Sequence, residues 1–227
     1  MKIPVMIFAA GRGTRMRELT QDRPKPMVCV NGTPLIDHAI ARTRTPAVSH
    51  RVVNVHHFAD LLQHHLRNAG VLVSDERDDL LETGGGLRKA MPLLDQSPVF
   101  TMNSDALWVG PDPFSCLIDA WRDEMEGLLL LAAPEQRQGH LGTGDFTMAE
   151  DGRITRQGDL VYTGLQIIRT DRLATIEDRA FSLNAVWQRM IAHNTLFGVV
   201  YSGQWCDVGQ PESIPLAEAL LRGERRV

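Results

Sequence analysis

Cysteine is scarce in this 227-residue sequence, and the spacing of the few cysteines excludes their usual structural uses. The three cysteines, Cys29, Cys116 and Cys206, are odd in number, far apart and in no C-x-x-C arrangement. This pattern argues against a disulfide framework and against structural zinc, and it favours reduced thiols. No apolar run approaches the roughly twenty residues that span a bilayer, and the N-terminus shows no export pattern. We therefore expect a cytoplasmic protein without a membrane partner.

Lysine is equally rare, with three lysines beside 21 arginines. The formal net charge of −4 and the lack of an extended basic face exclude nucleic acid as the expected partner. Apolar residues make up 43% and charged residues 23%, which is ordinary for a globular protein. The length favours one large α/β domain over residues 1–227. We expect a monomer or a small homo-oligomer.

Apolar, β-branched runs alternate along the chain with segments of helical period. This alternation predicts an α/β fold, a Rossmann-like and mostly parallel sheet flanked by helices. The expected strands cover residues 5–10, 51–55, 71–74, 99–102 and 128–132, and the expected helices cover 35–43, 58–69, 85–94, 114–125 and 183–193.

After about residue 139 the alternation of strand-like and helix-like segments gives way to short β-like runs. Short β-like runs at 145–148, 153–156 and 160–168 are separated by turn residues, which predicts a small antiparallel insertion over about 139–168. A last strand at 196–201 leads to residues 205–209 and to a closing helix over about 211–222. We expect no C-terminal β-helix domain.

A glycine-containing loop follows the first predicted strand. Gly11 and Gly13 let the backbone fold closely around a ligand, and consecutive backbone N–H groups in such a loop suit phosphate oxygens. Residues 11–26 carry five positive and two negative side chains, a local excess inside an acidic protein. The sequence therefore predicts a polyphosphate site here.

Two common phosphate loops are excluded by the letters of the sequence. A Walker loop needs a Gly-Lys pair, which the chain lacks, and the dinucleotide fingerprint needs a third glycine where Met16 stands. The remaining pattern is G-x-G-x-R-M with a downstream Lys25-Pro26. This pattern resembles the signature of the sugar-1-phosphate nucleotidyltransferases, which join a nucleoside triphosphate to a sugar 1-phosphate and release pyrophosphate.

The resemblance implies roles for individual residues of the loop. Arg15 and Lys25 would act on the reacting phosphates as catalytic residues. A lysine kept beside a glycine loop is also notable because the chain has so few, and a flexible point charge can follow a phosphate as its charge redistributes. The triphosphate would lie on the loop residues Ala10, Gly11, Gly13 and Thr14.

Two aspartates stand where predicted strands end, and ligands of open α/β sheets bind at such ends. Asp105 follows Asn103-Ser104 after a central strand, and Asp207 lies in the late Trp205-Cys206-Asp207 segment. Mg²⁺ is usually held by one or two carboxylates with phosphate oxygens and water. An Asx turn or a helix cap explains either aspartate alone. The resemblance supports the metal reading, although Ser104 stands where the family usually has glycine.

A second glycine cluster and a later segment are assigned to the nucleoside and the sugar. The resemblance places Gly84, Gly85 and Asn103 against the nucleotide and Glu82 in the same neighbourhood, as a substrate contact. A plain helix-entry turn is the alternative reading of the glycines. The sugar would meet Asp145, Thr163 and Gly164 in the antiparallel insertion. Asn54 and His56, near the end of another predicted strand, are weaker candidates.

The expected activity is Mg²⁺-dependent nucleotidyl transfer from a nucleoside triphosphate to a sugar 1-phosphate. The resemblance, strongest in the 81–86, 139–146 and 205–209 segments, favours UTP and N-acetylmuramic acid 1-phosphate. Two alternatives stay open: a guanylyltransferase acting on mannose or heptose 1-phosphate, and a catalytically inactive nucleotide-sensing subunit. The second would have lost Arg15, Lys25, Asp105 or Asp207, and all four are present.

Overall fold

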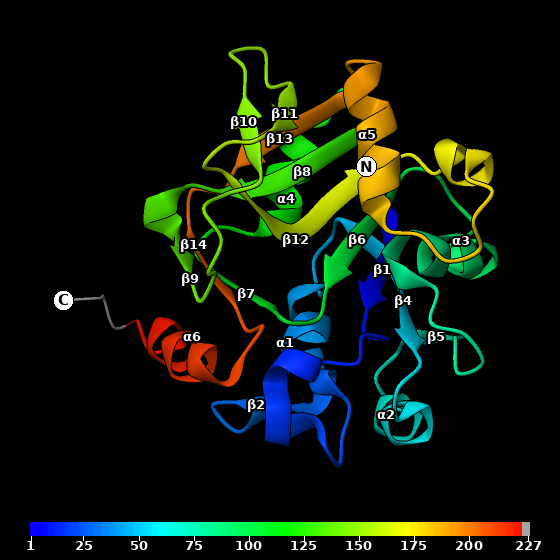
Figure 1. Ribbon diagram of the computed structural model, residues 1–227, viewed down its shortest axis with the longest axis vertical. Helices are drawn as coiled ribbons and strands as arrows, with labels where there is room; N and C mark the ends of the chain where they lie inside the picture. Colours follow the sequence, from blue (N-terminus) through cyan, green and yellow to red (C-terminus); the bar gives the residue numbers. More distant parts are fainter. Residues whose placement is uncertain (224–227) are drawn as a thin grey trace.

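The computed structural model describes residues 1–223 and has a seven-stranded sheet at its centre (Figure 1). From one edge of the sheet to the other, the strands are β13 (Leu196–Val200), β8 (Gly127–Ala132), β12 (Val161–Ile168), β6 (Val99–Asn103), β1 (Ile3–Phe8), β4 (Val48–Val55) and β5 (Leu72–Asp75). Neighbouring strands are parallel except around β12, which runs antiparallel to both β6 and β8. The expected mostly parallel α/β sheet is confirmed.

The antiparallel insertion is smaller than the sequence predicted. Only β10 (Phe146–Met148) and β11 (Ile154–Arg156) form a separate hairpin, whereas β12, predicted to belong to it, lies inside the central sheet. The residues of β12 predict a strand, but strand propensity alone does not reveal which sheet the strand joins.

Helices cover both faces of the central sheet. Side chains of α1 (Leu35–Arg42), α2 (Ala59–Leu66) and α4 (Pro113–Ala120) share one buried cluster, and those of α3 (Glu82–Leu94) and α5 (Leu183–Ala192) share another. The strands supply alternate residues to the two: Leu128 and Leu130 of β8 face the first cluster, and Leu129 and Leu131 face the second. This alternation follows from the two-residue period of a strand.

A second sheet of three strands joins distant parts of the sequence. It consists of β7 (Ala106–Val109), β14 (Gln204–Asp207) and β9 (Arg137–Gln138), with β14 in the middle. The short strand β7 was not predicted, because four apolar residues directly after another strand give no periodic signal of their own. A two-stranded hairpin, β2 (Cys29–Val30) with β3 (Thr33–Pro34), and the closing helix α6 (Ile214–Leu221) pack nearby.

The predicted helices are found, with shifted ends. Helix α4 ends at Ala120 and not at residue 125, because Trp121 adopts an extended backbone and packs against the core. The closing helix begins as a short 3-10 turn at Pro211–Ser213 before α6. No helix within residues 1–223 has the length and apolarity needed to cross a membrane.

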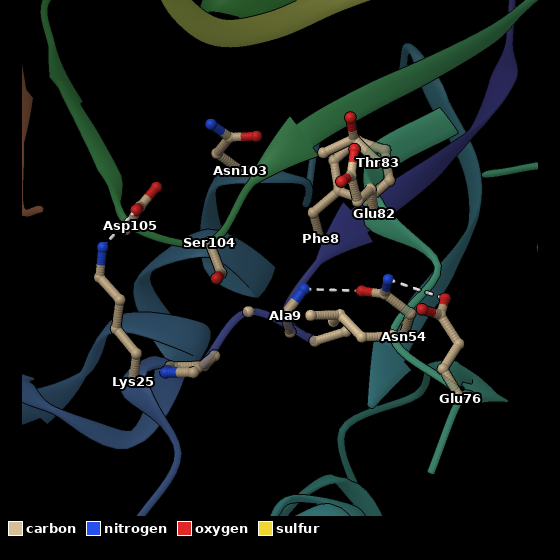
Figure 2. A pocket seen from close by; sticks show the side chains of 14 residues that line it. Phe8, Ala9, Lys25, Asn54, Glu76, Glu82, Thr83, Asn103, Ser104 and Asp105 are labelled. Atoms are coloured by element: carbon tan, nitrogen blue, oxygen red, sulfur yellow. Dashed lines mark hydrogen bonds and ion pairs between the residues drawn. The ribbon is translucent and has the colours of Figure 1, made fainter. Parts of the chain in front are cut away.

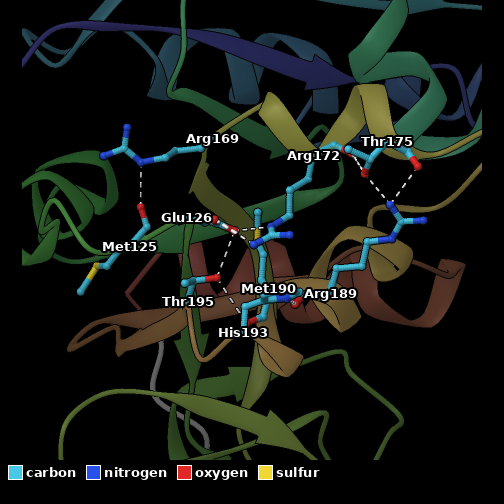
Figure 3. A network of polar contacts seen from close by, with 9 residues as sticks. All are labelled: Met125, Glu126, Arg169, Arg172, Thr175, Arg189, Met190, His193 and Thr195. Atoms are coloured by element: carbon cyan, nitrogen blue, oxygen red, sulfur yellow. Dashed lines mark hydrogen bonds and ion pairs between the residues drawn. The ribbon is translucent and has the colours of Figure 1, made fainter.

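A polar network fixes the edge of the molecule away from the glycine loop (Figure 3). Glu126 receives two hydrogen bonds from the Arg172 guanidinium, one of them Nη2 to Oε1 at 2.9 Å, and a third from Thr195 Oγ1 at 3.0 Å. Burial opposes ionisation of Glu126, but these donors hold the pKa of the carboxyl below its ordinary value. The network therefore ties the segment after β12 to the starts of β8 and β13.

We expect Glu126→Gln to lower the free energy of unfolding by about 1 kcal/mol at pH 7, because a fork of charge-assisted hydrogen bonds is lost in a partly exposed site. A carboxyl with a lowered pKa stabilises the fold above the pKa of the unfolded chain, so the difference should shrink below about pH 4. Urea unfolding at pH 7 and pH 3.5 measures both values. Glu124→Gln, which removes the exposed pair with Arg122, is the control and should change nothing measurable. Equal effects of the two substitutions would contradict the stabilising role assigned to the hydrogen bonds of Glu126.

Candidate active site

Backbone pairing brings Asp105 and Asp207 together although they are far apart in sequence. Asp105 lies in the turn between β6 and β7, next to Ala106, and Ala106 pairs directly with Asp207 of β14. The backbone N–H of Val208 also donates to the carbonyl of Asp105 at 2.9 Å. The register of two strands therefore places both predicted metal ligands at one point.

Two cations offset the charge of this carboxylate pair. The Lys25 Nζ lies 2.5 Å from Asp105 Oδ2, and both side chains are largely shielded, with 11% and 23% exposed. Burial raises the pKa of Asp207 to about 6, and the nearby Asp105 adds to the rise, while Lys25 and Arg15 oppose it. A Cβ on Gly209 would lie 3.1 Å from Asp207 Oδ1 and 3.3 Å from Arg15 Nη1, so this glycine leaves room for both groups.

The glycine loop holds Lys25 in place. Gly13 has φ +65°, and a Cβ there would lie 2.6 Å from the Cβ of Lys25, so only glycine fits without displacing the lysine. At the start of the loop, the Ala9 N–H donates to Asn54 Oδ1 at 2.7 Å. Thr14 is exposed at the beginning of the short 3-10 helix Thr14–Thr20. The Thr20 hydroxyl donates to the Gly13 carbonyl at 3.2 Å, so the loop is held at both ends.

Three cavities meet at Asn103, the last residue of β6. We name them by one residue each: the Glu76 cavity, the Asp207 cavity and the Arg156 cavity, with volumes of about 200, 280 and 480 Å³. Asn103 lines all three, Asp105 lines the first two, and Arg15 lines the last two. The charged pair and its cations therefore lie at the junction of a composite site.

The Glu76 cavity extends from the glycine loop to the N-terminal end of α3 (Figure 2). Ala10, Gly11 and Lys25 line it on the loop side. On the far side Asn54 Nδ2 donates to Glu76 Oε1 at 2.9 Å, while Oε2 of this fully buried carboxyl accepts no hydrogen bond of normal geometry. Burial raises the pKa of Glu76, and neighbouring donors and cations offset only part of the rise.

The second glycine cluster packs closely against a distant segment of the chain. Gly84 and Gly85 do not line the Glu76 cavity; both backbone N–H groups donate to the carbonyl of Phe181, at 2.8 and 3.1 Å. A Cβ on Gly84 would lie 2.3 Å from the Phe181 ring. Close packing of α3 against residues 179–181 thus uses these glycines, and their expected contact with the nucleotide stays a prediction. Glu82, with φ +59°, and Thr83 line the cavity instead.

The predicted sugar residues lie around the Asp207 and Arg156 cavities. Gly164, with φ +88°, packs on Asn103, where a Cβ would lie 2.9 Å from that side chain's Cβ. Thr163 is fully buried and its hydroxyl donates to the Leu130 carbonyl, so its side chain is already engaged. Asp145 lines the Arg156 cavity, and its Oδ2 accepts the Tyr162 N–H at 3.0 Å.

Three residues of the composite site were missed by sequence reasoning. Glu76 directly follows β5, so the strand-end rule that singled out Asp105 could have found it. His140 lines the Asp207 cavity, and burial lowers its pKa. Its buried Nε2 has no hydrogen-bond partner among residues 1–223. Arg156 lies on the small hairpin, and nothing in its local sequence indicates that it reaches a cavity.

The donor set at the junction fits a hard divalent cation. Within residues 1–223 no group of three or more histidine, cysteine or acidic side chains is placed to hold a metal. Asp105 and Asp207 alone are the arrangement that Mg²⁺ uses when substrate phosphates and water complete its coordination. The pKa of Asp207 is raised chiefly by burial and further by the neighbouring Asp105, and a bound cation would offset both effects.

Comparison with known proteins agrees with this geometry. Residues 5–224 match the family model of the MobA-like NTP transferase domain. The chain belongs to this family. It is 41% identical to the N-acetylmuramate alpha-1-phosphate uridylyltransferase of Caulobacter vibrioides over 95% of this chain and 96% of that protein. It is 28% identical to the protein of the same name from Neisseria meningitidis serogroup B, over 95% and 96% of the two chains.

A solved structure shows the same fold at low identity. The chain resembles a putative glucose-1-phosphate thymidylyltransferase of Bacillus anthracis with a TM-score of 0.80 and 16% identity, over 99% of this chain and 97% of that one. This likeness shows the fold. The family match and the 41% identical relative show that the protein is a sugar-1-phosphate nucleotidyltransferase, built as a MobA-like NTP transferase domain.

We expect Asp207→Asn to stabilise the metal-free protein at pH 8 by about 1–2 kcal/mol, because one unit of pKa shift corresponds to about 1.4 kcal/mol and the site is partly screened. The Asp207 carboxyl has a higher pKa in the folded protein than in the unfolded chain, so it stays protonated to a higher pH when folded. The free energy of unfolding therefore falls as pH rises from about 4 to about 6. The gain should therefore vanish near pH 3.5. Urea unfolding with a chelator at both pH values measures it.

The matched control for this prediction is Asp119→Asn, on the exposed surface of α4, which should leave stability unchanged at both pH values. A loss of stability in Asp207→Asn at pH 8, or a gain of equal size at pH 3.5, would show that the carboxylate pair is not under electrostatic strain.

Proposed function

We propose that the protein transfers a uridylyl group from UTP to N-acetylmuramic acid 1-phosphate, giving UDP-N-acetylmuramic acid and pyrophosphate. The observation that carries the proposal is the assembly of Arg15, Lys25, Asp105 and Asp207 at the junction of the three cavities. Two relatives that match nearly the whole chain bear the name of this activity, which favours this nucleotide and this sugar. A cytoplasmic location is proposed as well, and the lack of a disulfide within residues 1–223 supports it.

UTP would lie with its base in the Glu76 cavity and its phosphates over the glycine loop. The loop offers backbone N–H groups at Gly11 and Gly13, and Lys25 supplies a cation beside them. Uracil presents one ring N–H between two carbonyls. The Glu76 Oε2 can accept from that N–H when it is ionised, or donate to a carbonyl when the carboxyl is protonated.

The sugar phosphate would enter from the Asp207 and Arg156 cavities. One of its phosphate oxygens attacks the α-phosphorus in line; the new P–O bond forms as the bond to the β-phosphate oxygen breaks, and pyrophosphate leaves with that electron pair. The attacking phosphate is already ionised near neutral pH, so no general base is required. Arg15, which lines both cavities, is placed to hold it, and Lys25 to neutralise charge on the triphosphate.

Asp105 and Asp207 would hold Mg²⁺ together with the phosphates. A bound Mg²⁺ supplies charge neutralisation on the triphosphate and the leaving pyrophosphate. Lys25 forms an ion pair with Asp105, and the other N–H groups of its ammonium can donate to a phosphate. The protein residues thus bind and orient the two anions and reduce the repulsion between them.

The test is pyrophosphate release with Mg²⁺ from each of UTP, GTP, CTP, ATP and dTTP, combined with N-acetylmuramic acid 1-phosphate, mannose 1-phosphate and heptose 1-phosphate. We expect release with UTP and the muramic acid phosphate. Release only with GTP and mannose or heptose 1-phosphate would keep the mechanism and overturn the substrates. Nucleotide binding without release in any combination would favour the nucleotide-sensing alternative.

We expect Lys25→Ala to lower kcat by about 100-fold or more, because it removes a preorganised cation from the reacting phosphates. The fold should persist, since the lysine reaches the site through a loop and its ion pair is confined to that site. Steady-state kinetics with circular dichroism measure both effects. The other lysines are few, and Lys2→Ala, exposed at the N-terminus, is the control. A normal turnover of Lys25→Ala would refute the assigned role.

A further inference from the structure

The Arg156 cavity has an aromatic wall and is larger than a phosphate requires. Its volume of about 480 Å³ lies in the range of small-molecule sites. Trp187 forms edge-to-face contacts with Tyr162 and Phe146, with ring centroids 4.9 and 6.0 Å apart. Such a wall suits the apolar face of a sugar ring and small alkyl groups. The cavity adjoins the junction of the site through Arg15 and Asn103.

Arg156 is held firmly at this wall. Its guanidinium lies 4.5 Å from the centroid of the Phe146 ring and 5.4 Å from that of Trp187, and Nη2 donates to Asn184 Oδ1 at 2.5 Å. Stacking on aromatic rings fixes the plane of a guanidinium and leaves its edge available for hydrogen bonds. Arg156 is the last residue of β11 in the small hairpin, and its side chain reaches Asn184 at the start of α5.

The positive charge of Arg156 is not neutralised by an ion pair. Within residues 1–223 no carboxylate lies within 4.0 Å of it, and its Nε and Nη1 groups have no partner there. Asp145, which lines the same cavity, attracts it from farther away, but its Oδ2 accepts the Tyr162 N–H. Arg153, on the same hairpin, differs: it forms an ion pair with Asp151. Arg156 is thus a fixed, half-buried cation that faces a cavity.

We propose that Arg156 binds the lactyl carboxylate of N-acetylmuramic acid 1-phosphate and so selects this acidic sugar over a neutral hexosamine phosphate. The inference rests on the proposed function. Muramic acid differs from glucosamine by a lactic acid ether on O3, which adds one carboxylate to the far side of the ring. A guanidinium fork matches a carboxylate in shape and charge. The sugar would then have an anion at each end, with the phosphate near Arg15 and the carboxylate at Arg156.

The test compares two acceptors at saturating UTP: N-acetylmuramic acid 1-phosphate and N-acetylglucosamine 1-phosphate. We expect Arg156→Gln to lower kcat/KM for the muramic acid phosphate by about 30- to 100-fold, as for other hydrogen bonds to a charged group, mainly through KM. The value for the glucosamine phosphate should change less than about threefold, since that sugar offers no carboxylate. Arg156→Lys keeps the charge but not the fork, so its kcat/KM for the muramic acid phosphate should lie between those of the wild type and Arg156→Gln.

Arg153→Gln is the matched control, because it changes an arginine of the same hairpin outside the cavity. It should leave both acceptors unchanged. Where the glucosamine phosphate turns over too slowly, the dissociation constants of the two UDP-sugars, measured by calorimetry, give the same ratio. Thermal unfolding of each variant separates a change in binding from a change in folding.

The outcomes distinguish a failure of the role of Arg156 from a failure of the proposed function. A wild-type enzyme that uses UTP and the muramic acid phosphate, together with an unchanged acceptor ratio in Arg156→Gln, overturns the role of Arg156 and leaves the proposed function standing. An equal loss for both acceptors assigns Arg156 a structural role and also overturns the proposal. A wild-type enzyme without activity on the muramic acid phosphate overturns the proposed function, and the selection by Arg156 with it.

Discussion

The site depends on keeping two like charges close together. Burial makes ionisation of Asp207 costly, and repulsion from the nearby Asp105 adds to that cost. Strand pairing between β7 and β14 fixes their separation, so the repulsion cannot relax by movement of either backbone. Lys25 and Arg15 offset part of the charge, and the close approach of the lysine in turn requires glycine at position 13. Much of the chemistry at this end of the sheet is arranged around that constraint.

The topology of the sheet explains why three cavities meet at one residue. The parallel strands β1 and β6 end at the same edge, which places the glycine loop beside Asn103. Because β12 runs in the opposite direction, its N-terminal half reaches the same edge, where Gly164 packs on Asn103. One antiparallel strand in a parallel sheet therefore brings the Asp207 cavity next to the Glu76 cavity. The second sheet completes the junction by adding Asp207.

Local sequence predicted the parts of the site that depend on local chemistry. The glycine loop, Lys25 and the two aspartates after strands are each readable within a few residues, and the structure brings them together. The role of Gly84 and Gly85 was not readable, because it depends on Phe181, about a hundred residues away. The membership of β12 in the central sheet and the position of Arg156 at a cavity likewise follow from packing between distant segments, which one sequence without a structure does not reveal.

Charged groups serve three different purposes in this protein, and their partners distinguish them. Glu126 and Arg172 satisfy each other away from the site and stabilise the fold. Asp105 and Asp207 oppose each other, so the metal-free fold carries a cost that a cation would relieve. Arg156 is held by aromatic rings and an amide without a counter-ion. Folding alone would favour pairing all of these charges. Departures from that rule are concentrated at the three cavities, as expected where stability is exchanged for ligand binding.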